Sequence, residues 1–257
     1  MANGYVKSAS TDPINFSLPN AATLGRVAGH SRIACYGHIP NAAAGSDVWE
    51  AGGAYPFQSS AVTLEILSAS ANDTAAGTGA RTFVIQGLDA NFNAISETIT
   101  MNGVTPVQSV NQYRRVNFLT IASAGSGNTN AGDVTLRVTG GGSTQALARA
   151  GYGYAKQAIY TVPNGFSLLV TDLLFEVGGF VASQGITFSY TRVNPSGLII
   201  TTNEYPTSSL VPVERVVFTG AMLQQTQTLT TRVISIVTAT SGYAAFNGIL
   251  VDNTQLV

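Results

Sequence analysis

Apolar residues in this chain recur at every second position far more often than at the three- or four-residue spacing of a helix. In 62–66 and 186–191, large apolar side chains alternate with Thr, Ser or Glu. Alternation places the apolar side chains on one face of an extended strand, where a second sheet can cover them. Segments of similar composition, rich in Val, Ile, Thr, Tyr and Phe, are 81–88, 95–101, 113–122, 133–138, 158–162, 166–177, 211–218, 228–237 and 243–251. The pattern predicts an all-β protein.

Turn signals separate these segments. Asn-Gly pairs at 102–103, 164–165 and 247–248 allow the positive φ angles of tight turns at little steric cost. Strands joined in this way, without helical segments between them, predict antiparallel β-sandwich or jelly-roll-like domains. Their polar faces carry Ser, Thr and Asn rather than Lys and Glu. Edges of that kind are weakly protected against pairing with another chain.

A glycine-rich stretch at 140–143 indicates a division of the chain near residue 150. The short run 146–150 that follows it is expected to form one helical turn. Ahead of the first predicted strand, Pro13, Pro19 and Pro40 stand among small residues that form no core of their own, so this part must lie against the first β-domain or a neighbour. We therefore expect an extended, irregular N-terminal arm over 1–55, a β-domain over 56–145 and a C-terminal β-sandwich over 151–257.

The content of charged residues is low. Lys and Arg number 12, Asp and Glu 13, and all four make up 10% of the chain, whereas a soluble domain carries about 25%. A hydrophobic content of 45% argues against disorder, and the scarcity of Lys and Arg argues against nucleic-acid binding. Such a surface is unusual for a free monomer, and we expect other chains to cover much of it.

Three further signals concern cellular location. The most apolar stretch, 166–182, is broken by Thr171, Asp172 and Glu176, so a membrane span of ~18 apolar residues is not predicted. Residues 1–13 contain no apolar core of a signal peptide. The single Cys35 permits no internal disulfide and fits a reducing cytoplasm.

Three residues of metal-ligating types lie in the arm. His30, Cys35 and His38 are residue types that bind zinc, with Asp47 or Glu50 as a fourth ligand. Their spacing matches no common zinc pattern and a second cysteine is missing. We therefore expect neither a metal nor another cofactor, and interpret the three as ordinary residues of an ordered arm.

The segment 89–93, Asp-Ala-Asn-Phe-Asn, imitates the start of a calcium loop. However, Ala94 stands where the sharp turn requires Gly, and Thr100 stands where a bidentate Glu is required. A hairpin loop explains Asp89 equally well, and ion binding by this loop stays open.

Aromatic residues concentrate at Trp49, Tyr55 and Phe57. They could form a platform for carbohydrate or anchors at a subunit contact, where Trp and Tyr are enriched. With a single Trp, we favour interface anchors. Asp47 and Glu50 could serve a glycosidase only if they faced each other across a cleft, so we expect no enzyme.

Short motifs follow one another in a fixed order from about residue 48 to the C-terminus. They are DVW at 47–49, GGAY at 52–55, SASANDTAAGTGAR at 68–81, GLD at 87–89, ETITMNGVTPV at 97–107, RRV at 114–116, NAGDV at 130–134 and AIYTVPNG at 158–165. In this order they resemble structural proteins of tailed bacteriophages, of a kind common in environmental phages. The first 45 residues carry no part of the resemblance.

The resemblance implies a virion component without enzymatic activity. We expect a head decoration or cement protein, or a head-tail accessory protein, that acts through protein-protein contacts. Its partners would be further copies of itself, for example in a trimer, and virion proteins such as major capsid or neck subunits, with assembly in the bacterial host cytoplasm. The alternative is a receptor- or carbohydrate-binding module of a tail fibre or baseplate, which predicts an exposed cluster near 91–93 or Tyr205.

Overall fold

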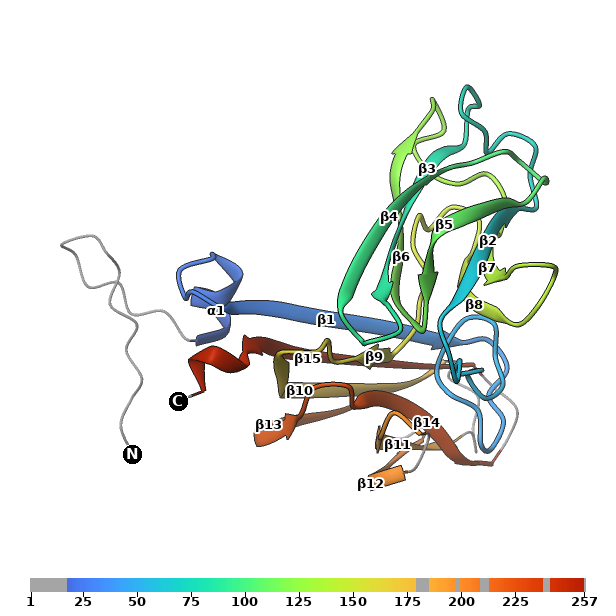
Figure 1. Cartoon of the computed structure of the whole chain (residues 1–257). Coiled ribbons are helices and arrows are strands. Elements are labelled where there is room, and N and C mark those ends of the chain that lie inside the picture. The colour runs from blue at the N-terminus through green and yellow to red at the C-terminus, as the bar shows by residue number, and fades with distance from the viewer. Residues whose placement is uncertain (1–17, 179–184, 197–198, 209–212, 238–240, 257) are drawn as a thin grey trace.

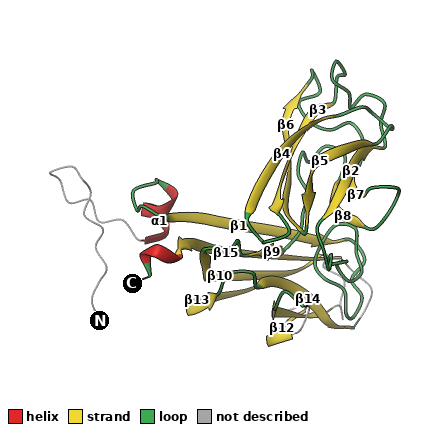
Figure 2. Ribbon diagram, in the orientation of Figure 1, coloured by secondary structure: helices red, strands yellow, loops and turns green. Residues whose placement is uncertain are grey.

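Nearly all of the regular secondary structure in the described chain is β-strand, arranged as two sandwiches (Figures 1 and 2). The computed structural model describes residues 18–178, 185–196, 199–208, 213–237 and 241–256. The all-β prediction is confirmed. Within these residues, no helix is long and apolar enough to cross a bilayer.

The first sandwich packs a four-stranded sheet, in the order β5-β2-β7-β8, against a three-stranded sheet, in the order β4-β3-β6. Inward-facing Leu64, Ile66, Phe83, Ile85 and Leu136 form the centre of its core, as the two-residue alternation predicts. The strands are β2 (Val62–Ser68), β3 (Ala80–Leu88), β4 (Ala94–Thr100), β5 (Val107–Tyr113), β6 (Arg115–Ala124), β7 (Val134–Val138) and β8 (Thr144–Ala148).

The second sandwich packs sheet β1-β15-β10-β13 against sheet β12-β11-β14-β9. Its core contains the stacked rings of Phe175 and Phe188 and the buried Phe246. The elements are α1 (Leu18–Thr23), β1 (His30–Ile39), β9 (Ile159–Thr161), β10 (Phe166–Gly178), β11 (Gly185–Val193), β12 (Ile199–Ser208), β13 (Val213–Leu223), β14 (Thr228–Ile236), β15 (Ser241–Asp252) and the 3-10 helix η1 (Asn253–Gln255).

Part of the range predicted as an extended arm is a strand of the second sandwich. β1 pairs with β15 over its whole length, from His30 opposite Val251 to Ile39 opposite Gly242. Its inward positions include Cys35, which is small, and Gly37, which has no side chain, so the alternation of large apolar residues is hidden in the sequence. Gly37 is required there, because a Cβ atom would lie 2.4 Å from the backbone of both Val48 and Ala158. Apart from α1 and β1, the described residues up to 55 form turns, bends and loops.

Two local predictions need correction. The run 146–150, expected as a helical turn, instead contributes to β8, which pairs with β7; its alanines fit because Ala146 and Ala148 are fully buried against the first core. The single strand expected over 113–122 begins at Tyr113, the last residue of the edge strand β5, and otherwise falls in β6, which starts at Arg115. β12 was not predicted at all; its Pro206 is tolerated because β12 is an edge strand.

The hydroxyl-bearing face of the β11–β14 pair is buried within the chain. Ser189 and Thr191 of β11, with Thr230 of β14, are almost fully inaccessible. Ser189 and Thr191 hydrogen bond to each other at 2.9 Å, and Thr230 donates to Asp47. This polar face is therefore satisfied by internal partners, and it positions the loop described next.

Candidate functional site

The aromatic loop that contains Trp49, Tyr55 and Phe57 lies at the junction of the two sandwiches. Trp49 and Tyr55 are buried and, with half-buried Phe57, form one cluster with Ile159 of β9. The ring centroids of Tyr55 lie 4.9 Å from those of both Trp49 and Phe57. The Tyr55 hydroxyl donates to the carbonyl oxygen of Gln145 in β8 at 2.9 Å. These predicted interface anchors therefore join the two sandwiches of one chain, and neither Trp49 nor Tyr55 presents a surface to a partner.

Asp47 fixes this loop to β14. Its side chain is fully buried and accepts hydrogen bonds from the backbone N–H of Tyr55 at 2.7 Å and the hydroxyl of Thr230 at 2.8 Å. Arg232 completes the set, with Nε 3.0 Å from Oδ1 and Nη2 3.3 Å from Oδ2. Both carboxylate oxygens of Asp47 are thus engaged in structural contacts.

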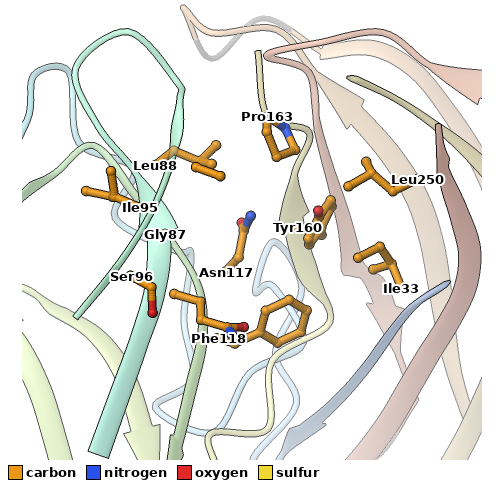
Figure 3. Close-up of a pocket in the computed structure, with 12 residues that line it drawn as sticks. Ile33, Gly87, Leu88, Ile95, Ser96, Asn117, Phe118, Tyr160, Pro163 and Leu250 are labelled. Carbon is orange, nitrogen blue, oxygen red and sulfur yellow. The ribbon is translucent and has the colours of Figure 1, made fainter. Parts of the chain in front are cut away.

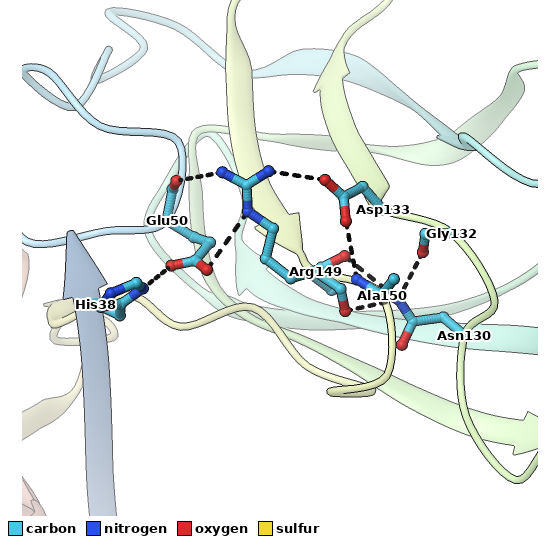
Figure 4. A network of polar contacts seen from close by, with 8 residues as sticks. His38, Glu50, Asn130, Gly132, Asp133, Arg149 and Ala150 are labelled. Atoms are coloured by element: carbon cyan, nitrogen blue, oxygen red, sulfur yellow. Dashed lines mark hydrogen bonds and ion pairs between the residues drawn. The ribbon is translucent and has the colours of Figure 1, made fainter. Parts of the chain in front are cut away.

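Glu50 belongs to a separate polar network (Figure 4). Its Oε2 lies 2.6 Å from Nδ1 of His38, and its Oε1 lies 3.4 Å from Nε of Arg149. Arg149 also contacts Asp133 at 2.8 Å. Burial tends to raise the pKa of Asp133, but hydrogen bonds from Ala150 N–H and Arg149 hold it below its ordinary value. Asp47 and Glu50 therefore serve different contacts and do not form a glycosidase pair across a cleft.

The three candidate metal ligands do not converge. Cys35 points into the core of the second sandwich, where burial raises the pKa of its thiol. His30 and His38, at odd spacing from Cys35, lie on the other face of β1. His30 contacts the carbonyl oxygen of Ala28. Among the described residues, no group of three or more His, Cys, Asp or Glu side chains could hold a metal ion.

The Asp89 loop is a closed hairpin turn. Asp89 accepts hydrogen bonds from the backbone N–H groups of Asn91 and Asn93, at 2.8 and 2.9 Å, and from the Asn93 amide at 3.1 Å. Phe92, with φ of 62°, is buried beneath the guanidinium of Arg114, 4.5 Å from the ring centroid. Phe92, the aromatic residue of the cluster expected to be exposed near 91–93, is therefore buried.

Tyr205, the other position expected for an exposed ligand-binding cluster, is half-buried. Its ring stacks on Phe175 with 5.0 Å between centroids.

A tyrosine-rich surface that the sequence reasoning missed lies beside the Glu50 network. Tyr36 is 38% exposed, Tyr152 51% and Tyr154 39%. The ring of Tyr243, on β15, stacks on those of His38 and Tyr36 of the neighbouring β1, with centroids 4.5 and 5.9 Å away. A sequence signal existed in the alternation of Tyr152 and Tyr154 with glycines. We call Tyr36, Tyr152, Tyr154 and Tyr243 the tyrosine surface.

The connection that carries Tyr152 and Tyr154 is held by internal hydrogen bonds. The Asn130 side chain donates to the carbonyl oxygen of Arg149 and accepts from the N–H of Gly153, at 2.9 and 2.8 Å. Lys156 lies 3.3 Å from the centroid of the Tyr152 ring. The two tyrosines are thus presented on a connection that is held to the first sandwich through Asn130.

A cavity of about 300 Å³ opens where the two sandwiches meet (Figure 3). The first sandwich provides one wall from β3, β4 and β6, and the second provides the other from β1, β9 and β15. The lining residues are Ile33, Gln86, Gly87, Leu88, Ala94, Ile95, Ser96, Asn117, Phe118, Tyr160, Pro163 and Leu250. None of them carries a charge.

Comparison with known proteins finds only weak structural similarity. No family model and no curated protein sequence matches the chain. Among solved structures, it is similar to the subviral particle of infectious bursal disease virus VP2, with a TM-score of 0.22 and 11% identity over 91% of this chain and 73% of that one. Particles derived from infectious bursal virus give a TM-score of 0.12 and 10% identity over 91% and 80%. These are viral particle proteins, but TM-scores this low carry no inference about the present chain.

Proposed function

We propose that this chain is a structural component of a virus particle, built to make protein-protein contacts rather than to perform chemistry. The tyrosine surface is the observation that carries the proposal. Interfaces are enriched in Tyr and depleted of charged residues at their centre. Here three partly exposed tyrosines converge on two rigid sandwiches, in a chain with only 10% charged residues.

Finer parts of the proposal rest on the sequence. The ordered motifs from residue 48 onward resemble tailed-phage structural proteins, which supports decoration or cementing of the head, or an accessory role at the head-tail junction. Further copies of this chain, and major capsid or neck subunits, are the proposed partners. The internal use of Asp47 and Glu50 agrees with a non-enzymatic role.

Replacement of exposed tyrosines tests the proposal. Tyr36→Ser combined with Tyr152→Ser removes two exposed rings and leaves both cores intact. We expect this variant to lose incorporation into particles, or self-association in light scattering after gel filtration, by about tenfold or more, because two interface hot spots contribute at least 1–2 kcal/mol each.

Val110→Ser is the matched control. Val110 is 89% exposed on β5 of the first sandwich and lies outside the tyrosine surface. Equal incorporation and self-association of the double variant and the control would overturn the role given to this surface.

A further inference from the structure

We propose that the junction cavity binds a small neutral ligand with an apolar ring and one hydrogen-bonding group. This site is separate from the tyrosine surface and does not depend on the virion role. The lining combines six large apolar or aromatic residues with a few polar groups, as is typical of small-molecule sites. Its volume corresponds to roughly ten water molecules.

The unused hydroxyl group of Tyr160 is the strongest indication of a ligand. The Tyr160 side chain is only 3% exposed, yet its hydroxyl has no hydrogen-bond partner among the described residues. It lines the cavity on the wall opposite Leu88 (Figure 3). The hydroxyl oxygen is not fully buried and retains some contact with solvent, and a ligand oxygen or nitrogen in the cavity would give it a hydrogen bond.

The first sandwich supplies two further free polar groups. Gln86 of β3 and Ser96 of β4 line the cavity, are exposed, and make no side-chain hydrogen bond within the described part of the chain. Asn117 differs, because its amide both donates to and accepts from the backbone of Thr161, at 2.9 Å in each direction. The available groups are therefore Tyr160 on one wall and Gln86 and Ser96 on the other.

The absence of charge among the lining residues sets the class of ligand. A carboxylate or ammonium group would lose part of its hydration against the apolar wall of the cavity without gaining an opposite charge, which is unfavourable. Burial raises the pKa of the Tyr160 hydroxyl, so it remains a neutral donor and acceptor across the physiological range. A neutral ring that carries a hydroxyl or amide fits both the apolar wall and the free polar groups.

Three methylbenzene compounds, which differ in the group opposite the methyl group, test the proposal on the full-length protein. They are 4-methylphenol, toluene and 4-methylbenzoate, used with saturation-transfer NMR and titration calorimetry up to about 10 mM, the range in which ligands of so few atoms bind. We expect 4-methylphenol to bind most tightly, toluene about fivefold more weakly for want of one hydrogen bond, and 4-methylbenzoate not at all.

Single-residue variants test whether the compounds bind in the junction cavity. Tyr160→Phe removes only the hydroxyl and is expected to reduce 4-methylphenol affinity to that of toluene, while toluene binding stays unchanged. Tyr154→Phe, which removes a hydroxyl outside the cavity, is the control. A conservative change at exposed Gln86, Gln86→Leu, tests the opposite wall without disturbing the core.

The proposal would be overturned if none of the three compounds bound, or if the anion 4-methylbenzoate bound most tightly. An equal loss of 4-methylphenol affinity in Tyr160→Phe and Tyr154→Phe would also overturn it. Binding of methyl α-glucopyranoside in preference to 4-methylphenol would also reject it, because the ligand would then be a carbohydrate rather than an apolar ring.

Discussion

Removal of the Asp47 carboxylate should open the junction loop. In Asp47→Ala, the buried N–H of Tyr55 and the hydroxyl of Thr230 lose their acceptor, and Arg232 loses its partner. An unsatisfied buried donor costs about 1–3 kcal/mol, and breaking a buried ion pair costs about 3–5 kcal/mol. Since the Arg232 side chain is 24% exposed and can rehydrate, we expect the lower end, a loss of about 3 kcal/mol in the free energy of unfolding.

Urea unfolding followed by tryptophan emission measures this loss directly. Trp49 is the only tryptophan, lies two residues from Asp47 and is buried, so opening of the loop should shift its emission to the red. Asp47→Asn keeps the size and one carbonyl acceptor but not the charge, and should lose about 1–2 kcal/mol.

The control is Glu204→Gln, an exposed carboxylate on β12, which should change the midpoint little. The reasoning would be refuted if Asp47→Ala lost less than about 1 kcal/mol with the emission of native Trp49 unchanged.

Three other perturbations follow from particular contacts. A hydrogen bond from the N–H of Gly140 and the pairing with Arg137 lower the pKa of Glu65. The ionised Glu65 therefore stabilises the fold above its unfolded pKa of about 4.5, and this stabilisation is lost as the pH falls through the lower folded pKa. Glu65→Gln should flatten the acid side of the curve of stability against pH, and an unchanged curve would contradict this. Gly37→Ala should destabilise the protein by about 1–3 kcal/mol in thermal unfolding, since its Cβ would meet backbone at 2.4 Å, whereas exposed Ala34→Ser should be nearly neutral. The buried Cys35 thiol should react with a thiol reagent only in denaturant; rapid labelling of the native protein would show that β1 does not seal the core.

The sequence was most informative where large residues alternate. Phe83 and Ile85, or Ile186 and Phe188, identify their strands because each inward position carries a large apolar side chain. β1 escaped notice because Gly37 and Cys35 occupy two of its inward positions. β8 was mistaken for a helical turn because alanine suits either structure, and only the packing against the first core decides between them.

The site was harder to predict because it depends on contacts between distant residues. The aromatic density around Trp49 and Tyr55 was correctly noticed, but their partners, Gln145 and Ile159, lie about a hundred residues further along the chain. Local sequence does not distinguish an aromatic residue that packs on its own chain from one that packs on a neighbour. The cavity depends likewise on how the two sandwiches meet.

The number of copies of this protein per purified virus particle tests the central claim most directly. The particles are purified on a gradient from cells that produce both the virus and this protein. Quantitative mass spectrometry then gives the number of copies relative to the major capsid subunit. The structural role predicts a fixed integer ratio that survives repeated purification and that falls for Tyr36→Ser with Tyr152→Ser. Absence from particles, or a ratio that drops steadily with each purification step, would contradict it.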